Sequence, residues 1–309
     1  MAKRSRTQTR TSAPAEGAVG PRQPCPCGSG KRYKACHGAP GGATDTFVAR
    51  AFEGLAGECD LVAMRELVPA ATAPLTVRDS DRTVQLCTLL PMAAPAMSRD
   101  SGEVWLGLQV QHSFGDPSRD LAAVLLAALD AEPGIVGLTD PPGEGPRLQD
   151  LVTNSSLDVT VHEGFDYWVA DVDDSDALAG ALEQANESAV PTSRLTTVEA
   201  AYWTDVGSKE HLRWVMPEPE DQLLDALARL HAARQDVIAP DARLVGMFRA
   251  HGLLAPVWDL PVGTGAEALE EPAEKFKAAL DEALADSSDL TTEQRAARSG
   301  LANRQVTIR

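Results

Sequence analysis

Four potential metal ligands lie close together near the N-terminus of the chain. Three cysteines and one histidine follow the pattern C-x-C-x8-C-H. These residues are Cys25, Cys27, Cys36 and His37. Three thiolates and one imidazole complete a tetrahedral zinc shell, and Gly28 and Gly30 allow the backbone to reverse tightly between the two pairs of ligands. Because the protein supplies all four ligands, we predict a closed, structural zinc site rather than a catalytic one.

Two other interpretations of this segment fit its sequence less well than zinc. Cys25 and Cys27 could form a redox pair, but the Cys-His step and the glycine turn fit zinc better. The run from Gly28 to Lys31 is similar to part of a phosphate-binding loop, yet it lacks the first glycine and has Arg32 where a serine or threonine is needed. A segment this short has no core, so zinc must supply its folding free energy, about 10–16 kcal/mol for structural sites.

Basic side chains and one aromatic ring stand between the two halves of the predicted zinc site. They are Lys31, Arg32, Tyr33 and Lys34. Such cations favour an acidic protein surface or RNA phosphates, and the tyrosine ring offers a stacking face. We therefore predict that these four residues contact a partner, the alternative being a solvated basic loop that binds nothing.

Residues 24–38 resemble the SEC-C motif, the zinc-binding tail of the SecA preprotein translocase ATPase. Ten positions match the motif: Cys25, Cys27, Gly28, Ser29, Gly30, Lys31, Tyr33, Lys34, Cys36 and His37. The resemblance implies zinc held by the three cysteines and the histidine, and a contact with the export chaperone SecB or the ribosome. Unlike the translocase, this chain has the motif at its N-terminus and lacks an ATPase motor. As a whole it resembles an uncharacterised family of SEC-C-bearing proteins from high-GC bacteria.

The charge of the chain is divided unevenly between this basic head and the remainder. The 309 residues have a formal net charge of −17, but residues 1–40 sum to +7 and residues 41–309 to −24. An acidic surface repels phosphates, which argues against nucleic acid as a partner of the body but not of the head. No apolar run approaches the ~18 residues of a membrane span, and no apolar region follows the basic start. With three of five cysteines in the motif, we expect a reducing, cytoplasmic location.

Hydrophobic periodicity predicts an α+β body built from antiparallel strands. Helical spacing extends over residues 47–67, broken by Gly57. Three blocks follow, each with adjacent strands and then a helix. The first has strands 75–78, 84–90 and 104–112 and helix 117–131. The second has strands 157–161 and 165–172 and helix 175–187, and the third has strands 198–204 and 211–215 and helix 218–234. The remaining elements are a short helix at 244–251, an extended piece at 253–260, a charged helix at 266–286 and a loosely attached polar end at 291–309. Whether the three blocks are a true repeat is left open.

These patterns divide the chain into five parts. The parts are a disordered basic arm at 1–24, the zinc module at 25–38, a linker at 39–43, an acidic α+β domain at 44–262, and a charged helix with a flexible tail at 263–309. In the body we expect the five tryptophans to pack in the core, with a binding cleft as the alternative, and Cys59 and Cys87 to be inert thiols.

The function we predict is that of a non-enzymatic adaptor. In this hypothesis the zinc module binds a protein of export, chaperone or translation machinery. One alternative is ribosome or RNA binding through residues 1–40, and a second is an enzyme in the acidic body. No sequence motif of a known catalytic type supports the second alternative, although catalytic groups can also converge without one.

Overall fold

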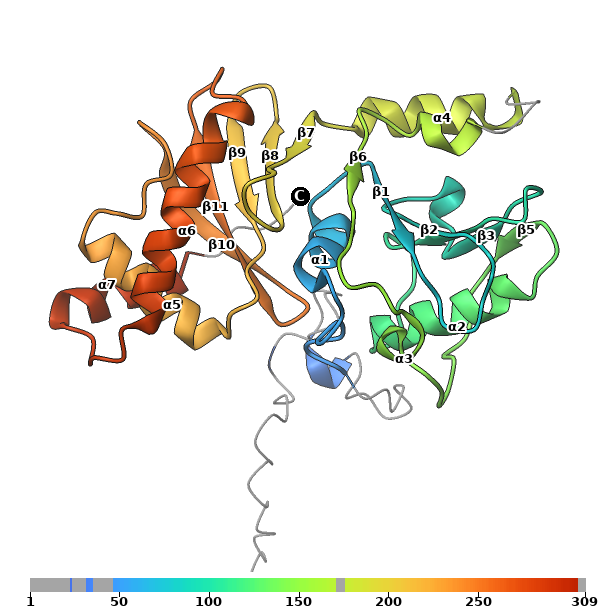
Figure 1. Cartoon of the computed structure of the whole chain (residues 1–309), viewed down its shortest axis with the longest axis horizontal. Helices are drawn as coiled ribbons and strands as arrows, with labels where there is room; N and C mark the ends of the chain where they lie inside the picture. Colours follow the sequence, from blue (N-terminus) through green and yellow to red (C-terminus); the bar gives the residue numbers. More distant parts are fainter. Residues whose placement is uncertain (1–22, 24–31, 36–46, 171–175, 305–309) are drawn as a thin grey trace, which may run out of the picture. The chain divides into compact units, whose positions relative to one another are not determined.

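The computed structural model describes residue 23, residues 32–35, residues 47–170 and residues 176–304 of the chain. The chain divides into two compact units, residues 1–47 and residues 48–309. The second unit has the expected α+β composition, with two largely antiparallel sheets and helices around them (Figure 1). It is referred to below as the body.

The first sheet has six strands in the order β5-β3-β4-β2-β1-β6. Its strands are β1 (Ala71–Leu75), β2 (Val84–Cys87), β3 (Ala96–Ser98), β4 (Val104–Gly107), β5 (Gly134–Val136) and β6 (Thr160–Val161). Neighbouring strands are antiparallel except for the central pair, β2 and β4, which run parallel with Val84 opposite Val104. The segments that follow β2 and β4 therefore leave the sheet at the same edge.

The second sheet has five antiparallel strands in the order β10-β11-β9-β8-β7. Its strands are β7 (Thr192–Arg194), β8 (Ala201–Asp205), β9 (Glu210–Trp214), β10 (Arg243–Ala250) and β11 (Leu253–Leu260). Alternation along β9 sends Leu212 and Trp214 into one core and leaves Arg213 on the other face.

Seven α-helices and four short 3-10 helices complete the described part of the chain. The α-helices are α1 (Glu58–Glu66), α2 (Pro117–Leu129), α3 (Leu148–Leu151), α4 (Asp176–Ser188), α5 (Glu220–Ala232), α6 (Glu270–Ala285) and α7 (Thr292–Ala302). The 3-10 helices are η1 (Tyr33–Ala35), η2 (Pro91–Ala93), η3 (Asp166–Val169) and η4 (Glu267–Leu269). Asp116 caps α2, predicted as a helix at 117–131, by accepting from the amides of Ser118 and Arg119, and Pro117 lies in its first turn. None of the described helices has both the length and the apolar character of a membrane span.

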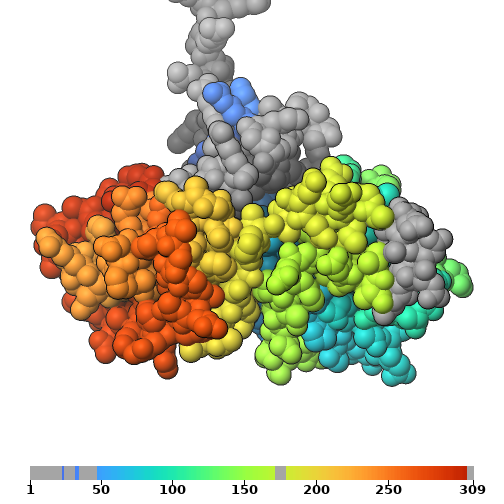
Figure 2. All heavy atoms as spheres, turned by 90° about the horizontal axis from the view of Figure 1, so that it is seen from above, coloured from blue at the N-terminus to red at the C-terminus, as the bar shows by residue number. Residues whose placement is uncertain are grey.

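Helix α1 lies between the two sheets (Figure 1) and is buried from Glu58 to Met64. One core cluster joins it to α2 and the first sheet, and also to Tyr202, Val215 and Val257 of the second half. The segments before and after about residue 190 occupy adjoining halves of the body (Figure 2). Because α1 is enclosed on several sides, its buried residues include the carboxylates Glu58 and Asp60 as well as the apolar run from Leu61 to Met64.

Two further clusters cover the remaining faces of the sheets. Helices α5 and α6 pack Leu227 and Phe276 against Trp214 and Trp258 of the second sheet. On the first sheet, Trp105 joins Phe165 and Trp168 of the η3 region. The expectation that tryptophans pack in the core is confirmed: Trp105, Trp168, Trp214 and Trp258 are buried, and Trp203 packs against the second cluster.

Gly57 fixes the start of α1. Its φ of 70° lies in the left-handed region, and a Cβ atom added here would lie 2.4 Å from the Cβ of Leu157. Both the backbone conformation and the space therefore require glycine. The predicted helix over residues 47–67 is correspondingly shorter, because residues 49–56 form turns rather than helix.

In two segments of the body the structure has a different type of secondary structure from the one predicted. Residues 244–251, expected as a helix, belong to β10, which pairs along its whole length with β11 through a turn at His251 and Gly252. The expected strand at 165–172 is instead the 3-10 helix η3, where Tyr167 and Trp168 both donate to the carbonyl of Leu89. Residues 171–175 lie outside the described residues.

The structure also differs from the expectation of a loosely attached C-terminal end. Residues 292–302 form α7, which begins with a capping box between Thr291 and Gln294 and buries Leu301 against the second core cluster. Arg298 forms ion pairs with Asp221 and Asp225 of α5. Apolar burial and ion pairs together hold this helix on α5.

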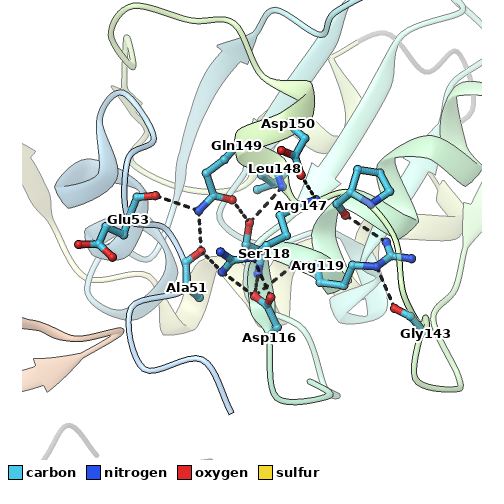
Figure 3. A network of polar contacts seen from close by, with 11 residues as sticks. Ala51, Glu53, Asp116, Ser118, Arg119, Gly143, Arg147, Leu148, Gln149 and Asp150 are labelled. Carbon is cyan, nitrogen blue, oxygen red and sulfur yellow. Dashed lines mark hydrogen bonds and ion pairs between the residues drawn. The ribbon is translucent and has the colours of Figure 1, made fainter. Parts of the chain in front are cut away.

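A polar network fixes the start of α2 to the segment that leads into α1 (Figure 3). The carbonyl of Ala51 accepts from Arg147 at 2.8 Å and from Gln149 at 2.9 Å. Ser118 donates to Gln149 at 2.6 Å, and Arg147 also donates to Asp116 at 3.0 Å. These bonds fix the N-terminal end of α2, and Pro117, Asp120 and Leu121 of this helix line the cavity described below.

Candidate functional sites

The predicted zinc ligands and Lys31 lie outside the described residues, so their geometry stays a prediction. Of the predicted partner-binding residues, Arg32 and Lys34 are exposed and Tyr33 is half-buried at the start of η1. The amide of Tyr33 donates to the carbonyl of Gln23 at 2.8 Å. This bond brings together two points of the chain that are ten residues apart.

The bond between Gln23 and Tyr33 suits the donor set of the motif. Cys25 follows Gln23 by two residues and Cys36 follows Tyr33 by three. Since a residue spans at most ~3.6 Å of chain, the two halves of the ligand set start from positions within reach of a single ion. Three thiols and one imidazole are also the donors that structural zinc prefers. The chemistry and the chain reversal therefore fit zinc.

The described part of the body holds no cluster of three or more His, Cys, Asp or Glu side chains that could bind a metal ion. Cys59 and Cys87 are both buried and free, and burial raises the pKa of each thiol well above its ordinary value. A thiol that stays protonated is a poor nucleophile and a poor ligand. The prediction that both cysteines are unreactive therefore has a physical basis in their burial.

Sequence reasoning missed a cavity of about 200 Å³ in the body. It lies where the chain leaves the parallel strands β2 and β4, between the η2 region, the segment after β4, the start of α2 and the segment after β5. Its apolar lining includes Met92, Val110, Leu121, Val124, Ile135 and Leu138. We call this space the apolar cavity. Ligands commonly bind outside the carboxyl ends of parallel strands.

A more open hollow of about 510 Å³ adjoins the apolar cavity and shares Arg65, Ala93, Val110 and Gln111 with it. Its charged lining residues are Arg65, Glu66 and Arg213. We call this space the basic hollow. Arginine prevails here within a body whose overall charge is strongly negative.

Side chains of the segment after β4 fix the walls between the two spaces. Arg65 donates to the carbonyl of Leu108 at 2.6 Å. Gln109 donates to the carbonyls of Met64 and Val68 at the end of α1, at 3.0 and 2.9 Å. Gln111 reaches the carbonyl of Met92 at 3.3 Å. The end of α1, the segment after β4 and the η2 turn are thus tied together before any ligand enters.

The charged side chains that line the two spaces have pKa values that their surroundings shift in different directions. Burial lowers the pKa of both Arg65 and Arg213 from the ordinary arginine value, but a guanidinium remains charged at neutral pH. Burial raises the pKa of Asp120, which lines the apolar cavity and accepts from the amide of Phe114 at 2.8 Å. Burial alone would raise the pKa of Glu66, but its contact with His251 at 2.9 Å lowers it overall.

Apolar side chains dominate the lining of the apolar cavity, and arginines dominate the charged lining of the basic hollow. The apolar cavity and the basic hollow have no serine or cysteine among their lining residues. What they offer is an apolar surface joined to guanidinium groups. No local sequence pattern marks this site, because its lining residues are spread from Arg65 to Arg213 and come together only in the fold.

The head and the body correspond to two known sequence families. A SEC-C motif model matches residues 22–39, which confirms the resemblance expected from the sequence, and the chain is thus an α+β protein with an N-terminal SEC-C motif. The chain belongs to a family of unknown function, DUF5926, whose model matches residues 51–309. No curated protein and no solved structure matches the chain significantly.

Proposed function

We propose that the chain is a non-enzymatic interaction protein of the cytoplasm, with a SEC-C head that binds one zinc ion and docks on a protein partner. Cys25, Cys27, Cys36 and His37 hold the ion in this proposal. The observation that carries it is the SEC-C match over residues 22–39, which includes all four ligands.

The partner we propose is an acidic surface on a protein of the export, chaperone or translation machinery. Exposed Arg32 and Lys34 and half-buried Tyr33 support this choice, together with the +7 charge of residues 1–40. Complementary charges steer association and set specificity at a surface of this kind. Zinc has a structural part in this scheme: it folds the head and so fixes the positions of the basic side chains.

Metal analysis of the purified full-length chain tests the first half of the proposal. We expect one zinc per chain in the wild type, and a loss of zinc in Cys36→Ser and in His37→Ala. Cys59→Ala is the matched control, because it removes a buried cysteine of the body and leaves the motif intact. Full zinc content in both motif variants would refute the assigned ligand set.

Affinity purification from native cytosol tests the second half. Cys36→Ser is expected to lose the partner while the thermal unfolding of the body is unchanged. The double variant Arg32→Glu with Lys34→Glu is expected to keep zinc and lose the partner, which separates docking from folding of the head. A variant set that retains every partner would contradict the proposal.

The same material distinguishes RNA from protein as the target of the head. RNA binding would replace the proposed docking if the chain co-sediments with ribosomes and three conditions hold. The co-sedimentation weakens steeply with salt, it persists when the protein partners are removed, and it disappears on deletion of residues 1–40.

A further inference from the structure

We propose that the body binds a small amphipathic anion. Its apolar group fills the apolar cavity at the carboxyl ends of β2 and β4, and its carboxylate or phosphate pairs with Arg65 and Arg213 in the adjoining basic hollow. This site is separate from the SEC-C head and does not depend on the function proposed for it.

The size and lining of the apolar cavity determine what its occupant can be. At about 200 Å³ it is comparable to an engineered cavity of roughly 150 Å³ that holds benzene in another protein. Val124 and Leu121 are buried in its wall. A single aromatic ring or a short hydrocarbon chain therefore fits, whereas a larger ligand does not fit within this cavity alone.

Two large apolar side chains at this cavity remain exposed to water. Met92 is 71% exposed and Ile135 is 46% exposed, although both line the cavity. Met92 and Ala93 also have φ values of 60° and 52°, which side chains other than glycine rarely adopt. Strained, non-glycine backbone is often found at ligand sites, and a bound apolar group would bury part of this exposed surface.

The guanidinium groups of the basic hollow supply the complementary half of the site. Arg65 is 11% exposed, donates to the Leu108 carbonyl and has Glu66 at 3.5 Å from its Nε atom. Arg213 donates to the Leu67 carbonyl through Nη1 at 3.3 Å and forms no ion pair with a described residue. Removing arginine from water is unfavourable unless an anion or several acceptors replace the water. A ligand anion would supply that replacement.

A purely structural role would leave most donors of these arginines unused. A guanidinium carries five N–H bonds in a planar fork, which matches a carboxylate or phosphate in a two-point contact. One carbonyl bond anchors each group: Arg65 donates to Leu108 just after β4, and Arg213 donates to Leu67 at the end of α1. Because the basic hollow lies beside these groups, the remaining N–H bonds are accessible to a ligand that enters it.

The walls of the site are fixed before binding. The bonds of Gln109 to the last turn of α1 and of Gln111 to Met92 hold three segments in place. A site that is ordered in advance loses little conformational entropy on binding. Asp120 works in the opposite direction, because its carboxylate lies in the wall of the apolar cavity and repels an anion.

Calorimetric titration of the full chain with matched small molecules tests the site. The probes are phenylacetate, phenyl phosphate, the neutral phenylacetamide and inorganic phosphate. We expect one of the two aromatic anions to bind with a Kd below about 1 mM and the other more weakly, which tells carboxylate from phosphate. Phenylacetamide and inorganic phosphate should each bind at least roughly 10-fold more weakly, since each lacks half of the contacts.

Variants assign the two halves of the site. Arg65→Gln and Arg213→Gln are each expected to weaken the better anion roughly 10- to 100-fold. Val124→Phe fills the apolar cavity and should abolish binding although both arginines are retained. Asp120→Asn should tighten binding roughly 2- to 5-fold by removing a like charge. Arg229→Gln is the matched control, because Arg229 is also 11% exposed and donates to backbone carbonyls, but lines a different hollow.

Three results would overturn the proposal. The first is that neither aromatic anion binds the wild type in the millimolar range. The second is equal affinity for phenylacetate and phenylacetamide, and the third is binding that survives both Arg213→Gln and Val124→Phe. If Arg65→Gln does not fold, the other two variants still decide the outcome.

Discussion

Asp60 provides the most direct test of how the two halves of the body are held together. This carboxylate is 2% exposed on α1, and it accepts from three donors of the second sheet. Arg194 approaches it through Nε at 3.0 Å and Nη2 at 2.9 Å, and the Tyr202 hydroxyl donates at 2.6 Å. Replacing Asp60 by alanine leaves the guanidinium and the phenol without their acceptor.

The expected cost follows from the geometry. Breaking a buried ion pair by removing one partner costs about 3–5 kcal/mol. The side chain of Arg194 is 25% exposed, so water restores part of its solvation and the lower end of this range applies. We therefore expect Asp60→Ala to lower the free energy of unfolding by about 3 kcal/mol. Tyr202→Phe removes a single bond to a charged group and should cost about 1.5–2 kcal/mol.

Urea unfolding followed by tryptophan fluorescence measures both changes. A double-mutant cycle between Asp60→Ala and Arg194→Met isolates the energy of the pair, which we expect to exceed about 1 kcal/mol. If Asp60→Ala costs less than about 1 kcal/mol, the attraction only balances the desolvation of the charges, and the network does not stabilise the fold.

Two further predictions concern Asp120 and the last helix. Burial raises the pKa of Asp120 above its ordinary value of 3.8. Its contribution to the free energy of unfolding is therefore fully present below pH 3.8, and it is lost as the pH rises through the pKa of the folded state. The free energy of unfolding of the wild type, relative to Asp120→Asn, should therefore fall as the pH rises above 3.8, and a flat difference would contradict the assigned burial effect. Leu301 is 1% exposed under α7, and Leu301→Ala should cost about 2–4 kcal/mol in thermal or urea unfolding; an unchanged midpoint would mean that α7 contributes little to the core.

Local sequence signals predicted most of the helices of the body. Asp116 and Pro117 mark the start of α2, and the stripe that includes Leu223, Leu227 and Leu230 is the buried face of α5. The charged helix predicted at 266–286 is present as α6, where Glu271 pairs with Lys275 and Lys277 pairs with Asp281. These features depend on residues three or four positions apart, which a sequence displays directly.

Strands whose partners are remote in sequence were harder to predict. The apolar run in β10 also suits a helix, and its assignment depends on pairing with β11. The sequence does offer one local signal, the glycine at position 252. His251 and Gly252 form a two-residue hairpin turn in which both residues have positive φ, and glycine is typical of such turns. In β1, the alanines and Pro74 gave no strand pattern, so the strand was predicted at residues 75–78 instead of Ala71–Leu75.

The two candidate sites also differ in whether their residues lie close together in the sequence. The zinc ligands fall within one short segment, so their types and spacing predicted the motif without knowledge of the fold. The apolar cavity combines the end of α1, the η2 turn, the segment after β4, the start of α2 and the segment after β5. Arg213 reaches the basic hollow from β9 because alternation places it opposite Leu212 and Trp214. None of these residues is conspicuous in the sequence.

The position of α1 has a consequence for the order in which the protein is made. Asp60 joins partners that are 134 and 142 residues further along the chain. At synthesis rates of ~5–20 residues per second, Asp60 is synthesised roughly 7–28 s before Arg194 of β7 and Tyr202 of β8. During that interval the apolar sides of α1 lack one of the two sheets that bury them, and such surfaces promote aggregation. The nascent chain therefore passes through a period of exposed core that ends only when the second sheet closes over α1.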